Sequence, residues 1–212
     1  IVADRVGDAS ELAQEATDNG LRAVGLELQA PRIGLTAIRI QSDLLPVLVS
    51  DITNEARAKI RSVLVRTATG VQRPREAREQ LVGTRGLLQP LTVIRRVRDR
   101  ETGRIKVVRQ RIGVAWRAEM LTRTEINRTF SIAGQEANLK TQKNVPDLKK
   151  QWLSARDDRV RDSHQRVDGQ IRDVDKPYDV NGSRMLFPHD QSLGAPASQI
   201  VNCRCRSIAW RE

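Results

Sequence analysis

VAWRAEMLTRTEINRTFSIAGQEANLK, residues 114–140, is the stretch of sequence that decides the fold. Seven of its residues follow one another at alternate intervals of four and three. This spacing predicts one long helix in which these residues form a continuous stripe along one face. The stripe consists of Trp116, Met120, Arg123, Asn127, Phe130, Gly134 and Ala137. Two of its members are polar, and they need polar partners if they are buried. We expect a buried polar network that joins two domains here, with a catalytic role for Glu125 as the alternative.

Helices are also predicted on the N-terminal side of this stretch. A short polar helix is expected over residues 8–29. An amphipathic helix is expected to be capped by Ser42-Asp43 and to end at Gly70. Its apolar face consists of Leu45, Leu48, Ile52, Ala56, Ile60, Val63 and Thr67. A shorter helix is expected between Pro74 and Gly83, because proline suits a helix start and glycine a helix end.

Between these helices and the long one, the periodicity changes to two. LTVIRRVRDRETGRIKVVRQRIGV, residues 91–114, predicts strands over about 91–98 and 104–112, joined by a turn at Asp99–Gly103. The hairpin is strongly basic, and we expect its positive side chains to contact an acidic protein surface or DNA phosphates. These are Arg95, Arg96, Arg98, Arg104, Lys106, Arg109 and Arg111. A merely solvated ribbon is the alternative.

After Pro146 the chain becomes a series of short segments separated by Asp, Gly and Pro turns. This pattern predicts a compact domain with a small, mostly antiparallel sheet. The expected fold class is therefore α+β, with long N-terminal helices and a basic β-hairpin arm preceding the compact domain. We divide the chain into a helical docking region, residues 1–113, and a second unit, residues 114–212.

The composition limits the classes of function. The chain has 37 Lys and Arg against 26 Asp and Glu, a net charge of +11, and only 3% aromatic residues. A polyanionic partner would therefore be bound through its phosphates rather than by stacking of bases. No apolar run reaches the length of a membrane helix, so no membrane partner is expected. GxGxxG, P-loop and paired CxxC motifs are absent, which argues against dinucleotide binding, ATP-driven packaging and zinc fingers.

RDDRVRDSHQRVDGQ, residues 156–170, is the densest polar constellation. A helical turn is expected in its first part, with Asp157 and Asp158 paired to Arg161. His164 lies four residues before Asp168, which suggests a general base or metal ligand oriented by that carboxylate. We favour the alternative that these two residues hold a turn, with Gly169 supplying its unusual backbone conformation.

The only two cysteines lie in NCRC, residues 202–205. On a strand Cys203 and Cys205 share one face, and their separation disfavours a disulfide. Two thiolates at this spacing could form half of a zinc site, completed by His164 and His189. The otherwise small, apolar face favours buried core cysteines instead. No other cofactor is expected.

These motifs in this order resemble the phage Mu F-like minor head proteins, the head morphogenesis family. The resemblance covers about residues 114–212, and the basic hairpin looks like an insertion. The matching residues are Thr124, Glu125, Asn127, Trp152, Arg156, Asp157, Asp158, Arg159, Ser163, His164, Asp168, Gly169, Pro188, Asn202, Cys203 and Cys205.

The resemblance implies a minor capsid protein of a tailed phage, assembled in the host cytoplasm and located in the virion head. Its role would be structural, in prohead assembly and DNA packaging or delivery near the portal. The expected partners are the portal protein, the major capsid protein, or both, with double-stranded DNA as a further partner. Some relatives carry a toxin domain after the NCRC motif. This chain ends shortly afterwards, at Glu212, so no such domain is expected.

Two alternatives stay open beside the head protein. One is a small nuclease- or hydrolase-like enzyme that uses His164 and Asp168 with Cys203, Cys205 and Arg159. The other is a DNA-binding protein of the head interior. We expect no enzymatic activity, because a second acid–base group is not evident in the sequence.

Overall fold

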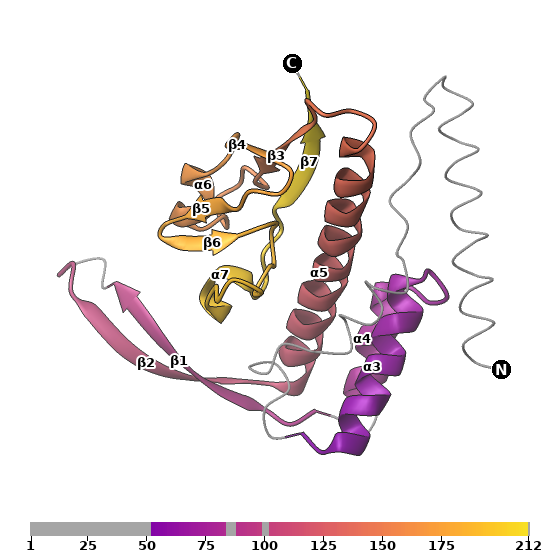
Figure 1. Cartoon of the computed structure of the whole chain (residues 1–212). Coiled ribbons are helices and arrows are strands. Elements are labelled where there is room, and N and C mark those ends of the chain that lie inside the picture. Colours follow the sequence, from indigo (N-terminus) through magenta and orange to yellow (C-terminus); the bar gives the residue numbers. More distant parts are fainter. Residues whose placement is uncertain (1–51, 84–87, 99–101, 212) are drawn as a thin grey trace.

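The computed structural model describes residues 52–83, 88–98 and 102–211, which form an α+β fold as the sequence predicts (Figure 1). Helices lie on the N-terminal side, and small antiparallel sheets follow the longest helix. The helix predicted over residues 8–29 and the predicted cap at Ser42-Asp43 fall outside the described residues. None of the helices within these ranges is long and apolar enough to span a bilayer.

Three helices form the N-terminal part: α3 (Asn54–Ala68), α4 (Pro74–Gly83) and α5 (Val114–Gln142). The side chain of Thr53 caps α3 by accepting the N–H of Ala56 at 3.2 Å. The cap places Ile52 before the helix, so the prediction of an uninterrupted helix through that residue was wrong. The predicted stop is confirmed, since Gly70 has a φ of +78°. The predicted bounds of α4 are also confirmed.

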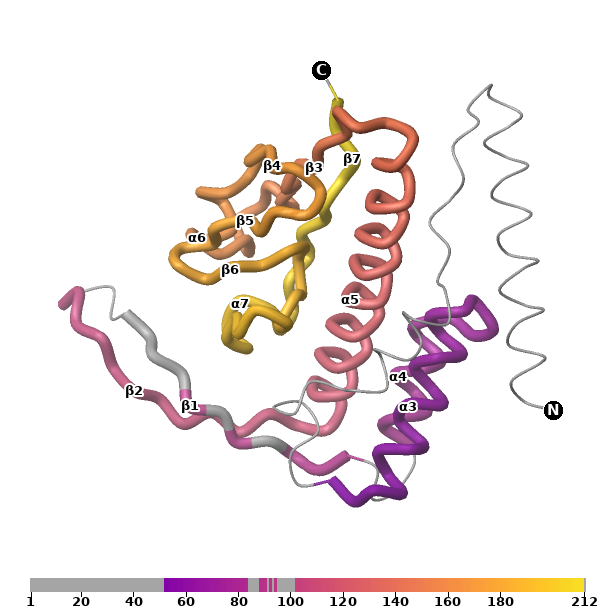
Figure 2. The backbone as a smooth tube through the Cα atoms, in the orientation of Figure 1, coloured from indigo at the N-terminus to yellow at the C-terminus, as the bar shows by residue number. Residues whose placement is uncertain are grey.

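α5 lies in the middle of the molecule, with α3 and α4 on one side and the sheets on the other (Figure 2). The predicted stripe is not the buried face, because Trp116 is 50% exposed and Phe130 is 45% exposed. The buried stripe lies next to it and is largely polar: Arg117, Leu121, Thr124, Arg128, Ser131 and Gln135. Apolar periodicity failed here because these polar side chains are buried together with hydrogen-bonding partners.

The predicted hairpin consists of β1 (Leu91–Arg98) and β2 (Ile105–Ile112). The strands are antiparallel, with Leu91 opposite Ile112 and Arg98 opposite Ile105. Figure 1 shows the hairpin reaching away from the base of α5. Every side chain of β2 is exposed except Ile112, which joins the core at the base of the hairpin.

The C-terminal region contains two small sheets. β3 (Lys149–Leu153) is the middle strand of the first, between β4 (Ile171–Asp173) and β7 (Arg206–Trp210). The second is the hairpin of β5 (Tyr178–Val180) and β6 (Ser183–Met185). Asn181 and Gly182 join these two strands with positive φ angles of +53° and +81°, as a tight hairpin turn requires.

Two local predictions in this region were wrong. The helical turn is α6 (Asp162–Arg166), which starts after the RDDRV stretch rather than within it. Another short helix, α7 (Ala197–Ile200), precedes NCRC, and β7 begins only at Arg206. Cys203 and Cys205 therefore lie in the loop before β7 and not on a strand. Asn202 turns this loop with a φ of +58°.

One cluster of buried side chains runs from the helices into the sheets, from Ile60 and Leu81 through Leu121 to Trp152. Trp152 is fully buried, and its ring packs edge-on against Tyr178 and His164, with centroids 5.2 and 5.4 Å away. The indole of Trp152 on β3 thus contacts one ring from β5 and one from α6, and links these three elements. The division into two domains after residue 113 stays a prediction.

Replacing Leu81 with Ala should lower the free energy of unfolding by about 2–5 kcal/mol, because Leu81 is fully buried and the change leaves a cavity. Urea denaturation measures the loss. Its neighbour Val82 is 42% exposed on the same helix, so Val82→Ala is the matched control and should cost about 0.5 kcal/mol or less. Equal losses in the two variants would contradict this packing of α4.

Candidate functional site

The chemically most reactive groups meet in one buried cluster, formed by His164 of α6 with Cys203 and Cys205 of the loop before β7. All three are at most 2% exposed. Nδ1 of His164 lies 3.4 Å from Sγ of Cys205 and 3.5 Å from Sγ of Cys203. The three ligand atoms lie within 4.8 Å of one another. We call these three residues the His/Cys cluster.

The other ring nitrogen of His164 fixes the orientation of the imidazole. Nε2 lies 3.0 Å from Oε1 of Gln199, which also accepts the hydroxyl of Ser163 at 3.0 Å. An amide oxygen can only accept, so Nε2 carries the hydrogen and Nδ1 presents its lone pair to the two sulfurs. The edge-on contact with the ring of Trp152, at an interplanar angle of 89°, also restricts the orientation of the imidazole. Sequence reasoning missed Gln199, because nothing in the local spacing of α7 points to a histidine 35 residues away along the chain.

The two thiols differ in acidity although they lie two residues apart. The pKa of Cys203 is lowered because its sulfur accepts a hydrogen bond from the Cys205 side chain. The backbone N–H of Cys205, 3.4 Å from the same sulfur, acts in the same direction. The pKa of Cys205 is raised because its proton is held by Cys203 and because the thiol is buried. The pair therefore gives up one proton much more easily than two.

His189 was a candidate ligand in the zinc alternative, but the structure places its ring elsewhere. It is fully buried, with Nε2 2.9 Å from the backbone oxygen of Cys203 and Nδ1 3.3 Å from Oγ of Ser131. Burial lowers its pKa to about 4, so the ring is neutral near pH 7. His189 thus donates to the carbonyl of Cys203 and supports the loop from behind.

The predicted pairing of His164 with Asp168 does not occur. The carboxylate of Asp168 accepts the N–H of Ser154 at 2.7 Å and Nε of Arg156 at 2.9 Å. Burial opposes ionisation of Asp168, but these hydrogen bonds outweigh it and the pKa is lowered. Asp168 therefore fixes the end of β3, and Gly169, with a φ of +80°, supplies the turn that the sequence predicts.

The expected ion pairs of Asp157 and Asp158 with Arg161 are not formed either. Asp157 instead binds both terminal nitrogens of Arg204, and this pairing lowers its pKa to about 2. Arg161 donates to the backbone oxygen of Val201. Both contacts hold the loop before β7 against the 156–162 segment. Local helical spacing could not reveal them, because the segment is not a helix.

A second set of contacts ties the same loop to α5. Of the two polar residues that the sequence analysis expected in a buried network, Asn127 takes part, whereas Arg123 pairs with Glu119 of its own helix and is partly exposed. Oγ1 of Thr124 accepts the N–H of Asn202 at 2.9 Å. The amide of Asn127 donates to the backbone oxygen of Cys203 at 3.3 Å and accepts from Arg206 at 2.9 Å. We call these contacts the α5 seam. Glu125, proposed as a catalytic alternative, is fully buried and lies 3.5 Å from Arg128.

Lys150 of β3 is a buried cation that sequence reasoning missed. Its Nζ donates to the backbone oxygen of Leu186 at 2.6 Å and to Oε1 of Gln135 at 3.3 Å. The ring of Tyr178 lies 5.2 Å from the same nitrogen. Burial lowers the pKa of Lys150 to about 8, against the opposing effect of nearby carboxylates. The alternation of β3 marks its position as inward-facing, but nothing in the sequence announces its partners.

The predicted basic contacts lie apart from the cluster, on the hairpin. Arg104, Lys106, Arg109 and Arg111 are exposed. The backbones of Arg95, Arg96 and Arg98 belong to β1, and their side chains lie outside the described part of the structure. The structure therefore places these positions on one ribbon and leaves their partner open.

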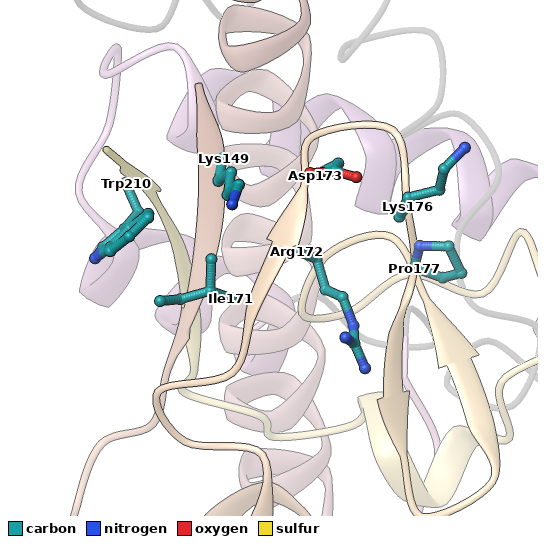
Figure 3. Close-up of a pocket in the computed structure, with 7 residues that line it drawn as sticks. All are labelled: Lys149, Ile171, Arg172, Asp173, Lys176, Pro177 and Trp210. Atoms are coloured by element: carbon teal, nitrogen blue, oxygen red, sulfur yellow. The ribbon is translucent and has the colours of Figure 1, made fainter. Parts of the chain in front are cut away.

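A surface pocket of about 580 Å³ is lined by residues of all three strands of the sheet β4-β3-β7 and of the turn after β4 (Figure 3). Its lining mixes cations with an acid and an indole: Lys149, Ile171, Arg172, Asp173, Lys176, Pro177 and Trp210. In Figure 3 the side chain of Trp210 lies on the Lys149 side of the pocket, and Nζ of Lys149 is 6.0 Å from the indole centroid. No residue of the His/Cys cluster lines this pocket, so its space is not a route to the thiols.

The arrangement of the His/Cys cluster limits its chemistry. A cysteine of lowered pKa beside an imidazole is the pairing that nucleophilic catalysis uses. Here, however, all three side chains are closed off from solvent, so a substrate does not reach the sulfurs. Two sulfurs and one ring nitrogen turned toward a common point can instead hold a thiophilic metal ion.

Comparison with known proteins assigns more than half of the chain to one family. The family described as Phage Mu protein F like protein matches residues 92–208. The match begins within β1 and so includes the hairpin, which does not support its interpretation as an insertion. No solved structure matches the chain significantly.

A curated relative is the NAD(+)--arginine ADP-ribosyltransferase EFV of Enterococcus faecalis. It is 34% identical to this chain over 88 residues, which are 42% of this chain and 18% of that protein. The chain thus spans less than a fifth of the length of this relative.

Replacing Asn127 with Ala should lower the free energy of unfolding by about 1–2 kcal/mol, since two hydrogen bonds of the α5 seam are lost. Urea denaturation again provides the measurement. Asn138→Ala on the same helix is the control, because Asn138 is partly exposed like Asn127 but takes no part in the α5 seam, and it should change stability by about 0.5 kcal/mol or less. A loss at Asn138 as large as at Asn127 would contradict the role of the seam.

The lowered pKa of Lys150 predicts a pH dependence. Between the folded pKa of about 8 and the unfolded value of 10.5, the unfolded chain binds more protons at this residue, so stability rises with pH. The free energy of unfolding is measured against pH for the wild type and for Lys150→Met. Subtracting the second profile from the first cancels the contributions of the thiols and of Tyr178. The difference should rise by about 1–2 kcal/mol between about pH 7.5 and about 9.5. Lys149→Met should keep the wild-type dependence of stability on pH. If the difference between wild type and Lys150→Met does not change with pH, the pKa of Lys150 is not lowered by burial.

Proposed function

Because the chain belongs to the Phage Mu protein F like family, we propose that it is a minor head protein of a tailed phage. Its role is structural: it takes part in assembly of the prohead and in packaging or delivery of DNA near the portal, within the virion head. The observation that carries this proposal beyond the family is the exposed hairpin β1–β2, which acts as a docking arm.

The hairpin exposes apolar side chains that a free ribbon would not need. Ile94, Ile105 and Val107 are each at least 66% exposed. A two-stranded ribbon is only marginally stable alone, and clustered exposed apolar residues are typical of protein interaction surfaces. These side chains therefore favour burial against another protein rather than a purely solvated ribbon.

The charges of the hairpin indicate what kind of surface the partner presents. Successive residues of a strand alternate in direction, so Ile105, Val107, Arg109 and Arg111 share one face. A face that carries both aliphatic and arginine side chains suits a protein interface with an acidic partner surface. We therefore place the arm on the portal or the major capsid protein, with DNA phosphates as the competing partner.

The enzymatic alternative receives less support from the geometry. His164 is closed to solvent, and Asp168 is engaged by Ser154 and Arg156 instead of orienting an acid–base group. The transferase activity in the name of the Enterococcus relative belongs to a protein of which the match covers 18%. We propose that the 88 matched residues are a module shared by both proteins, separate from the transfer chemistry.

The arm hypothesis predicts co-purification of the chain with its cognate portal after nuclease treatment. Reversing the charge of Arg104, Lys106, Arg109 and Arg111 to Glu should weaken the complex at least about tenfold, because charge complementarity with the acidic surface is lost. Pull-down at low and high salt with titration of the portal gives the affinity. The same reversal at the exposed Arg61, Arg73, Arg172 and Arg184 is the matched control and should leave binding near the wild-type value.

Two outcomes would overturn the docking arm. Equal losses in both four-fold variants would make the effect one of net charge alone. Absence of a portal or capsid complex, together with binding to bare duplex that weakens with salt by a slope of about −0.9 per phosphate contact, would indicate a DNA-contacting protein instead.

A further inference from the structure

We propose that the His/Cys cluster is a zinc site, in which Nδ1 of His164 and the Sγ atoms of Cys203 and Cys205 coordinate one Zn²⁺ ion. The site would pin the loop before β7 to α6. This inference concerns a different part of the molecule from the docking arm and does not depend on a role in the phage head.

The spacing of the ligand atoms fits a tetrahedral ion. Zinc binds sulfur at ~2.3 Å and imidazole nitrogen at ~2.0–2.1 Å, so ligand atoms at two corners of the tetrahedron lie about 3.5 Å apart. The observed separations of Nδ1 from the two sulfurs are 3.4 and 3.5 Å. Both nitrogen–sulfur separations therefore match those of a tetrahedral site, and the two sulfurs lie within 4.8 Å of each other.

The donor set and its charge select zinc over the harder divalent ions. Two thiolates and one imidazole are ligands for zinc and other thiophilic metals, whereas calcium and magnesium take oxygen. Two thiolates also balance the charge of one Zn²⁺, so the occupied site is neutral. A neutral site is compatible with side chains at most 2% exposed, whereas two unpaired buried thiolates would be costly.

The surroundings of the cluster have the features of an outer coordination shell. A metal-bound histidine usually donates its second ring N–H to a fixed acceptor, as Nε2 of His164 does to Gln199. Gln199 is itself held by Ser163. The backbone N–H of Cys205 points to Sγ of Cys203, which stabilises a thiolate at that position. The imidazole is thus already in the tautomer that leaves Nδ1 free to coordinate.

The fourth coordination position falls to a water molecule. Within the part of the chain that the structure describes, no further His, Cys, Asp or Glu joins the three ligands. His189, the other histidine, uses both ring nitrogens on Cys203 and Ser131. Three protein ligands with water is also an arrangement of catalytic zinc, but here the enclosed side chains keep substrates out.

The test starts from the full chain purified under reducing conditions without chelator, with its metal content measured by mass spectrometry. The expected result is about one zinc ion per chain. The double variant Cys203→Ser, Cys205→Ser should lose at least about nine tenths of it, since both thiolates are gone. Leu81→Ala is the control, because it removes buried contacts in α4 outside the cluster and lowers stability without touching a ligand, and it should retain zinc.

A second measurement does not depend on variants that fold. Zinc is stripped from the wild-type chain by chelation, and cobalt(II) is then added. Thiolate-to-cobalt charge transfer in the near ultraviolet and intense visible bands of four-coordinate cobalt are expected, and they should saturate at one equivalent. Restoring excess zinc should raise the thermal midpoint by about 10 °C relative to the stripped chain.

Three results would overturn the zinc site. The first is wild-type protein without zinc whose stripped form gives no cobalt–thiolate band. The second is a double cysteine variant that holds as much zinc as the wild type. The third is a chain in which Cys203 and Cys205 form a disulfide after purification under reducing conditions.

Discussion

The loop that precedes β7 depends on its hydrogen bonds to α5, and much of the C-terminal region depends on that loop. Thr124 and Asn127 bind the backbone at Asn202 and Cys203 from one side. His189 binds the Cys203 carbonyl from another. Both cysteines of the loop belong to the buried core, and these directional bonds fix the backbone that carries them. The loop in turn carries both cysteines to His164.

This constraint explains why α5 is unusual as a buried helix. A helix packed on both sides normally buries apolar residues, but α5 buries Arg117, Thr124, Arg128 and Gln135. Arg117 donates to the backbone oxygen of Gln89, and Gln135 donates to that of Val174. Arg117 and Gln135 therefore each satisfy a carbonyl of an irregular segment, and Thr124 accepts the backbone N–H of Asn202. The helix acts as a polar template on which loops are held.

The features that the sequence predicted correctly are those set by local chemistry. Pro74 and Gly83 bound α4, and Gly70 ends α3. The hairpin follows from alternating residues on either side of a turn. The partners of Asp157, His164 and Lys150 were not predictable in this way. They are Arg204, Gln199 and Leu186, which lie 47, 35 and 36 residues away along the chain. Nothing in local spacing encodes such contacts, because they depend on how the segments pack.

The two distinctive features of the molecule differ in their dependence on the rest of the fold. Of the side chains of β2, Ile112 alone is buried and joins the core, so the exposed residues of β2 can change with little effect on the body. The His/Cys cluster lies where α6, β3 and the loop before β7 meet, beneath the ring of Trp152. Strands of three to five residues provide little sheet stabilisation at that junction. A metal cross-link between α6 and the loop would therefore stabilise the fold at a point where the sheets contribute little. This is a physical reason for three metal-binding side chains to be buried at that junction.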